Sequence, residues 1–269
     1  MRSVNAVSAD PLRRIAEIPD VESVVRETRA VVDRLLGHRV LRRHSSDISM
    51  EAALRGARGS AQLEGADVSL EEMRGGTGTD PRVRGALRVS AELGTLAATW
   101  RGAPRQVLAR LHVLAAADAV PADRLGRPRV DGESAGDPFG LGPAPGAAEV
   151  ARRLDALSWL LAAPASVPAL VVSALVHGEL LVLRPFGWGD GVVARAAERL
   201  TLVERGLDPK SLVPTELGHA ELRTGYAAAI RGYAEGTPAG VTGWVVHCSH
   251  AVAAGARESL AACEALRRG

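Results

Sequence analysis

The sequence predicts a mainly helical protein, and three observations support this prediction. Apolar residues recur at intervals of three and four in successive segments, which is the period of an amphipathic helix. Strand-like alternation is scarce, and only 3% of the residues are aromatic. Stretches rich in Gly and Pro separate the periodic segments. Of the 269 residues, 46% are apolar, which is enough for a large packed core.

The first strong helix is expected over Pro19–His38, where Gly37 suits the C-terminal end. Its apolar stripe comprises Val21, Val24, Val25, Val31, Val32, Leu35 and Leu36. A basic turn, residues 41–49, is expected to precede a second helix over about Met50–Glu64. A third helix begins at Ser69, which forms a capping box with the glutamate three residues later.

Helical patterns continue through residues 82–100 and 104–118. Residues 119–148 are rich in Pro, Gly and Asp, so we expect a loop there, with room for a short hairpin at 127–133. The remaining helices are expected over Glu149–Leu161, Pro168–Leu183 and Gly191–Gly206, and from Leu217 onward.

One uncharged segment, Ala156–Gly178, is long enough to span a bilayer. Pro164 and Pro168 divide it, however, and no aromatic or basic belt flanks it. We therefore expect a buried helix–loop–helix and no membrane association.

The net charge and the cysteine content bear on two questions: whether the protein binds nucleic acid and whether it works in a reducing compartment. The net charge is only +2, which gives no reason to expect nucleic-acid binding. Cys248 and Cys263 are too few to staple a chain of this length and suit a reducing cytosol. The first 20 residues have no apolar core of signal-peptide length, so we expect a cytoplasmic protein.

The segment "ALVHGELLVLRPFGWGDGVVARAAERL", residues 174–200, resembles the core of the Fic (Fido) family. The motif of that family is His-Pro-Phe-x-Asp/Glu-Gly-Asn-Gly-Arg-x-x-Arg. His177 stands at the family's upstream histidine position, seven residues before the motif begins at Arg184. The matching motif positions are Pro185, Phe186, Gly189, Gly191 and Arg195. Gly189 and Gly191 would permit the tight turn that holds an anion in relatives.

A second match lies upstream. "SAQLEG", from Ser60 to Gly65, resembles the family's inhibitory-helix motif, Ser/Thr-x-x-x-Glu-Gly/Asn. The resemblance implies that Glu64 is the inhibitory glutamate and that Arg195 is the arginine it blocks. It also implies an all-α, Fic-like core with an N-terminal inhibitory-type helix and at most a short β-hairpin flap. The corresponding parts are an N-terminal extension (1–44), the inhibitory-helix region (45–118), the core (119–216) and C-terminal helices (217–269).

Four positions depart from the family motif. Arg184 replaces the histidine that acts as general base in relatives, and a guanidinium cannot accept a proton at neutral pH. Trp188 replaces the acidic metal ligand, which makes magnesium doubtful. Asp190 replaces the asparagine of the phosphate cradle, and Val192 replaces a phosphate-binding arginine. The positions that shape the loop therefore match the family motif, whereas the positions that carry its chemistry do not.

These departures suggest a Fic-domain pseudoenzyme, a protein-binding or regulatory module with little or no AMP transfer. We expect a protein partner and no nucleic acid, and homodimerisation stays open. The alternative is a nucleotide-binding transferase with an altered mechanism, in which Asp190 or His177 is the base. ATP would bind only if Glu64 were displaced.

Two residue pairs allow two interpretations each. Glu64 and Arg195 form either a regulatory lock or a buried structural ion pair, and we favour the structural pair. Arg184 and Asp190 form either a new anion site or an internal salt bridge, and we favour the salt bridge.

The remaining histidines give weaker indications. "HCSH", residues 247–250, together with Cys263 suggests a metal site, but no close pair of cysteines completes it, so none is assigned. The basic run with His38, His44, Arg39, Arg42 and Arg43 is interpreted as a solvated turn, although an acidic partner could meet it.

Overall fold

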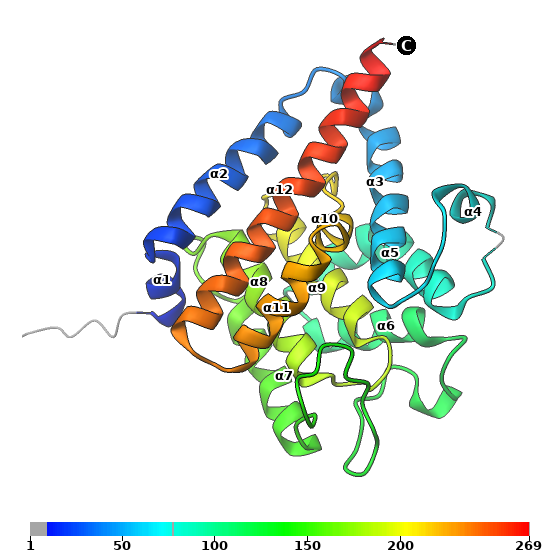
Figure 1. Cartoon of the computed structure of the whole chain (residues 1–269), viewed down its shortest axis with the longest axis vertical. Helices are drawn as coiled ribbons and strands as arrows, with labels where there is room; N and C mark the ends of the chain where they lie inside the picture. The colour runs from blue at the N-terminus through cyan, green and yellow to red at the C-terminus, as the bar shows by residue number, and fades with distance from the viewer. Residues whose placement is uncertain (1–9, 77, 269) are drawn as a thin grey trace, which may run out of the picture.

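The computed structural model describes residues 10–76 and 78–268, and this part of the chain is helical without any strand (Figure 1). The helices are α1 (Pro11–Ala16), α2 (Pro19–Leu36), α3 (Leu41–Leu63), α4 (Leu70–Gly75), α5 (Pro81–Trp100), α6 (Pro104–Ala116), α7 (Ala147–Leu161), α8 (Ala169–Leu183), α9 (Asp190–Glu204), α10 (Thr215–Glu221), α11 (Arg223–Ala234) and α12 (Pro238–Arg268), with a 3-10 turn at Ala122–Arg124. The all-helical prediction is confirmed. The expectation that the first 20 residues hold no signal peptide falls partly on residues 1–9, which lie outside the described part.

Most expected helices occur within a few residues of their expected bounds. The helix α2 ends at Gly37, and the capping box at Ser69 opens α4 with both of its hydrogen bonds. The basic turn expected at residues 41–49 is wrong, since this segment is the first part of α3 with a kink at His44. Leu41 and Ile48, two turns apart, are both buried in one core cluster, and this packing outweighs the run of charge.

The core is built around α8, which is buried on nearly all sides. Twelve of its fifteen residues are buried, and α9 returns against it after a six-residue loop. The long helix α12 packs against α2 on one side and α8 and α10 on the other (Figure 1). This arrangement places the α8–α9 loop, which carries the family-like motif, beside the irregular segment 119–146 and the end of α3.

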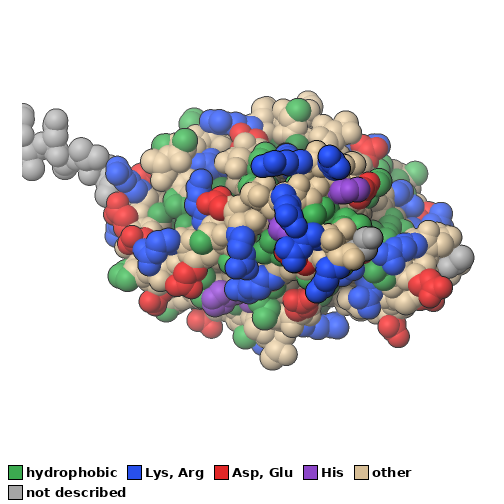
Figure 2. Space-filling model, turned by 90° about the horizontal axis from the view of Figure 1, so that it is seen from above, with side chains coloured by type: hydrophobic (Ala, Val, Ile, Leu, Met, Phe, Trp, Pro, Cys, Tyr) green, Lys and Arg blue, Asp and Glu red, His purple; other side chains and the backbone are tan. Residues whose placement is uncertain are grey.

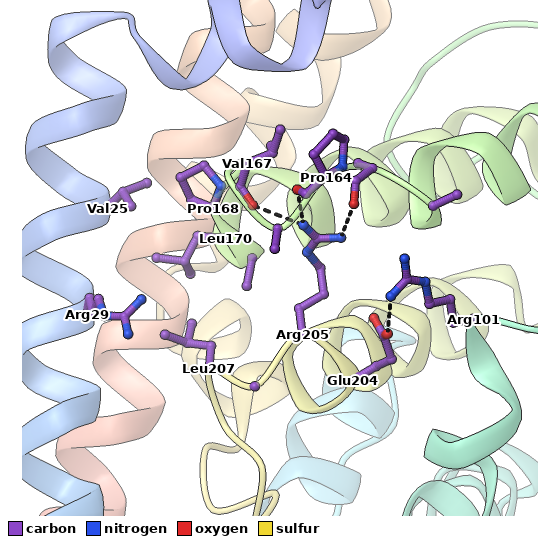
Figure 3. A pocket seen from close by; sticks show the side chains of 15 residues that line it. Val25, Arg29, Arg101, Pro164, Val167, Pro168, Leu170, Glu204, Arg205 and Leu207 are labelled. Atoms are coloured by element: carbon purple, nitrogen blue, oxygen red, sulfur yellow. Dashed lines mark hydrogen bonds and ion pairs between the residues drawn. The ribbon is translucent and has the colours of Figure 1, made fainter.

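The uncharged segment 156–178 forms the predicted helix–loop–helix, because α7 ends at Leu161 and α8 begins at Ala169. Arg205, just after α9, holds the connection by donating to the carbonyl oxygens of Ala163, Pro164 and Val167 at 3.2, 2.9 and 3.0 Å (Figure 3). A cavity of about 370 Å³ lies here, and its wall includes the Arg101–Glu204 ion pair. None of the described helices combines the length and the hydropathy needed to cross a membrane.

Residues 127–133 do not form the hairpin for which the sequence left room. Arg129 instead bonds to the α8–α9 loop, while Glu133 bonds within the segment to Val130 and Arg127. The amide of Arg129 donates to the Pro185 carbonyl at 2.7 Å, and its Nε donates to the Arg184 carbonyl at 2.9 Å. The segment is therefore fastened to the motif loop by a buried arginine.

Candidate functional site

The α8–α9 loop depends on backbone conformations with positive φ. Arg184 ends α8 with φ of 45°, and Gly187 and Gly189 follow with φ of 80° and 70°. A Cβ atom at Gly187 would lie 2.6 Å from the Ser134 carbonyl oxygen, so this position also needs glycine for space. The glycines predicted to permit a tight turn at the start of α9 do so at Gly189.

Pro185 and Phe186 anchor the loop in the core. Both are buried, and the ring of Phe186 stacks on His112 of α6 with centroids 4.2 Å apart. Gly126 donates its amide to Nδ1 of His112 at 2.9 Å. Burial lowers the pKa of His112 to about 4, so the imidazole is neutral at pH 7 and packs as an apolar ring.

Arg184, which aligns with the motif histidine, links the α8–α9 loop to residues 136–142. Its side chain is only 4% exposed and reaches back to the segment before α7. Nη2 donates to the Gly142 carbonyl at 2.7 Å, and Nη1 donates to the Gly136 carbonyl at 3.3 Å. Nη1 also forms an ion pair with Oδ1 of Asp137 at 3.4 Å. Burial lowers the pKa of this guanidinium, and Asp137 opposes that shift.

The expected salt bridge between Arg184 and Asp190 is wrong. The carboxylate of Asp190 instead accepts from the amides of Phe186 and Gly187 at 2.9 and 2.8 Å. Burial, and to a smaller extent the charge of Glu64, raises the pKa of Asp190 to about 7. Both amides belong to the first half of the α8–α9 loop, so the carboxyl group of Asp190 fixes the conformation of that loop. The loop therefore binds its own carboxyl group.

Glu64 and Arg195 form an ion pair, with Oε1 and Nη2 2.7 Å apart. Arg195 is fully buried, and Glu64 is 20% exposed at the C-terminal end of α3. Nε of Arg195 donates to the Ser60 hydroxyl at 3.0 Å, and Nη2 also donates to the Ser60 carbonyl at 3.1 Å. Thus "SAQLEG" and the last arginine of the motif lie together, as the resemblance implies.

Gly191 allows Glu64 to come this close. A Cβ atom on Gly191 would lie 2.1 Å from Oε1 of Glu64 and 3.0 Å from Nη1 of Arg195. The next residue, Val192, is 3% exposed and belongs to the main core cluster, so this side chain packs in the core. Trp188 is half-buried and forms part of the cavity wall.

These residues surround a cavity of about 490 Å³. Its lining includes Glu64, Arg82, Asp137, Phe139, Leu181, Arg184, Trp188 and Asp190 together with the loop glycines. Arg82 pairs with Asp80 at 2.6 Å and donates to the Glu64 carbonyl at 3.1 Å. Among the described lining residues, each arginine is thus already bound to a carboxylate or a carbonyl.

Sequence reasoning missed Arg129 and Asp137, which fasten segment 127–142 to the loop. No local signal could have found them, because their partners lie about 50 residues away and the segment has no periodicity.

His177 lies apart from the other motif residues. It is fully buried in α8, away from the cavity lining, with Nε2 2.9 Å from the Tyr226 hydroxyl and Nδ1 3.0 Å from Glu198.

The metal site considered for "HCSH" with Cys263 is not assembled. Among the described residues, the group with metal-ligand spacing takes Cys248 from that motif and joins it to His177, Glu198 and His219. Cys263 is buried in a different core cluster, and His250 is exposed.

Comparison with known proteins supports the fold. No family model and no curated protein matches the chain. A Fic family protein from Desulfovibrio desulfuricans is similar in structure, with a TM-score of 0.72 at 20% identity over 91% of this chain and 75% of that one. Fic-1 from C. elegans gives a TM-score of 0.68 at 17% identity over 91% and 73%. The fold of this protein is Fic-like.

Proposed function

We propose that this protein is a catalytically inactive member of the Fic fold that acts as a regulatory or protein-binding module, with little or no AMP transfer. One observation carries the proposal. The side chain at the motif-histidine position, Arg184, is buried and its guanidinium is bound to two carbonyls and a carboxylate of segment 136–142. A guanidinium in this setting neither accepts a proton nor is free to bind a phosphate.

Two further contacts support it. Asp190 binds two amides of its own loop, and Glu64 forms an ion pair with Arg195. A nucleotide phosphate would have to displace Glu64 to reach Arg195, and Trp188 offers a metal ion an indole in place of an oxygen ligand. The side chain at the motif-histidine position and the last arginine of the motif are thus both engaged by contacts within the chain.

A surface feature fits a binding role. Arg39, Arg42 and Arg43 are exposed where α2 meets α3, and no ion pair holds any of them within the described residues. Figure 2 shows basic side chains gathered on the face seen from above, at the end of the molecule where this connection and the C-terminus lie in Figure 1. The class of partner that fits such a surface is an acidic protein.

The first test is transfer from α-labelled ATP, measured for the wild type and for Glu64→Gly, with an active histidine-containing Fic protein as positive control. We expect no labelling of either chain or of added lysate proteins. Robust labelling by either form would overturn the proposal.

Calorimetry with ATP, with and without magnesium, then separates two forms of the inactive protein. If Glu64→Gly binds and the wild type does not, the Glu64–Arg195 pair is a regulatory lock. If neither binds at millimolar ATP, Arg184 and Asp190 close the site by themselves. The matched control is Glu51→Gly, which removes a carboxylate from an ion pair on the same helix outside this cavity.

One observation favours a transferase with an altered mechanism. The pKa of Asp190 is raised to about 7, which is the range of an effective general base, and Asp190 is part of the cavity wall. In that case Asp190→Asn, which keeps an acceptor for one loop amide, would abolish a measurable transfer while the protein stays folded. Unchanged activity in this variant would exclude Asp190 as the base.

A further inference from the structure

We propose that His177, Glu198, His219 and Cys248 form a buried, structural site for a divalent transition metal, with zinc as the best fit. The four residues come from α8, α9, α10 and α12, so that one ion would join four helices. The site lies among fully buried side chains outside the lining of the 490 Å³ cavity, and it stands apart from the proposed function.

The spacing of the donor atoms suits a tetrahedral ion. One nitrogen of each histidine, a carboxylate oxygen and the sulfur all lie within 4.8 Å of one another. Oε2 of Glu198 is 3.0 Å from Nδ1 of His177 and 2.8 Å from Nε2 of His219. Zinc bonds of their usual lengths put ligand atoms about 3.3–3.8 Å apart, so the group needs shifts of about 1 Å or less to close on an ion.

The second ring nitrogen of each histidine has its own partner. Nε2 of His177 lies 2.9 Å from the Tyr226 hydroxyl, and Nδ1 of His219 lies 3.1 Å from Nε2 of His247. Such outer contacts fix the tautomer and orientation of metal-binding histidines. Without a metal, Nε2 of His219 donates to Oε2 of Glu198 at 2.8 Å; with a metal bound, the outer contacts let both N–H groups point away from Glu198 and both lone pairs point toward the ion.

Two buried atoms in the group lack a hydrogen bond of normal geometry. They are Nδ1 of His177, despite its 3.0 Å distance to the carboxylate, and Oε1 of Glu198. Both side chains have no exposed surface. Buried polar atoms are nearly always satisfied, and an ion at the centre of the group would satisfy the nitrogen by coordination.

Charge and ligand type select the metal. A divalent ion bound by the Glu198 carboxylate and the Cys248 thiolate is electrically neutral, which removes the cost of a buried net charge. The thiol proton is released to solvent when the sulfur coordinates the ion. Two imidazole nitrogens, one thiolate and one carboxylate suit zinc, whereas magnesium and calcium prefer oxygen ligands alone. With four protein ligands and no open position, the site is structural.

The test begins with the metal content of the full-length wild-type protein, purified without chelator. We expect about one zinc per chain by elemental analysis. The protein refolded with cobalt should show the ligand-field bands of tetrahedral cobalt and a sulfur-to-cobalt charge-transfer band. A folded wild-type chain that holds no zinc and develops neither set of bands overturns the proposal, whatever happens to the variants.

The variants identify the ligands. Cys248→Ser should lose the charge-transfer band, whereas Cys263→Ser, which also removes a buried thiol, should keep it. Tyr226→Phe should lower metal affinity about 10–100-fold in competition with a chromophoric chelator, because it removes an outer contact of His177. Loss of the band in Cys263→Ser with retention in Cys248→Ser would refute the ligand set.

Discussion

Replacing Glu64 by glutamine tests whether its pair with Arg195 stabilises the fold. Removing one partner of a buried ion pair costs about 3–5 kcal/mol, because the remaining charge is left uncompensated. Arg195 is fully buried but keeps two hydrogen bonds to Ser60, and Glu64 is 20% exposed. We therefore expect a loss of about 2–3 kcal/mol in the free energy of unfolding. For a chain of this size that corresponds to a fall in Tm of about 5–10 °C.

The control has almost the same geometry without the burial. Arg105 and Asp155 approach to 2.6 Å, but both side chains are at least half exposed. Asp155→Asn should cost less than about 1 kcal/mol, as surface pairs usually do. Both variants are measured by urea unfolding at pH 7 with the slope of the transition compared. Equal small losses in the two variants would refute the argument from burial and leave Glu64 with a regulatory role only.

Three further predictions follow from single positions. Because the pKa of Asp190 is raised from 3.8 to about 7 in the folded state, the folded state retains a proton that the unfolded state loses, and this group lowers stability as pH rises from 4 to 7. Asp190→Asn should reduce this slope in Tm-against-pH measurements, and buried Asp208, whose pKa is raised to about 6, contributes to the part that remains. Gly85→Ala should destabilise the protein by about 1–3 kcal/mol in urea, since its Cβ would lie 2.1 Å from the Ala115 carbonyl oxygen. Gly94→Ala on the same helix meets nothing within 4 Å and should be neutral or stabilising. Arg184→His should still give no labelling from α-labelled ATP, because an indole, a carboxylate and a valine remain at the other three changed positions.

The sequence predicted the fold well wherever a segment had a clear helical period. The stripe from Val21 to Leu36 and the capping box at Ser69 each encode their structure within a few residues, and both helices form as expected. The start of α3 was misjudged because its cause is distant: Leu41 and Ile48 pack in a cluster with residues of α2 and α12. The six-residue α1 gave no period to detect.

The sequence predicted which residues form the site, but it predicted only some of their interaction partners. The motif placed Glu64 and Arg195 together, and they form an ion pair. The charge argument paired Arg184 with Asp190, and geometry opposes it. Asp190 begins α9, only three and four residues from the two loop amides that it binds, whereas the left-handed backbone of Arg184 accompanies a side chain that extends to the carbonyl oxygens of segment 136–142. Asp190 therefore binds the nearby backbone amides instead of the oppositely charged Arg184.

The buried group around Glu198 joins α8 and α9 through contacts that do not involve the α8–α9 loop. Nδ1 of His177 on α8 and Oε2 of Glu198 on α9 are 3.0 Å apart, and His219 and Cys248 join them from two further helices. The register of α8 and α9 is thus fixed by contacts inside the core, independently of the residues at the mouth of the cavity. Under the proposed function, residues of the loop can therefore differ from the family motif while these core contacts maintain the fold.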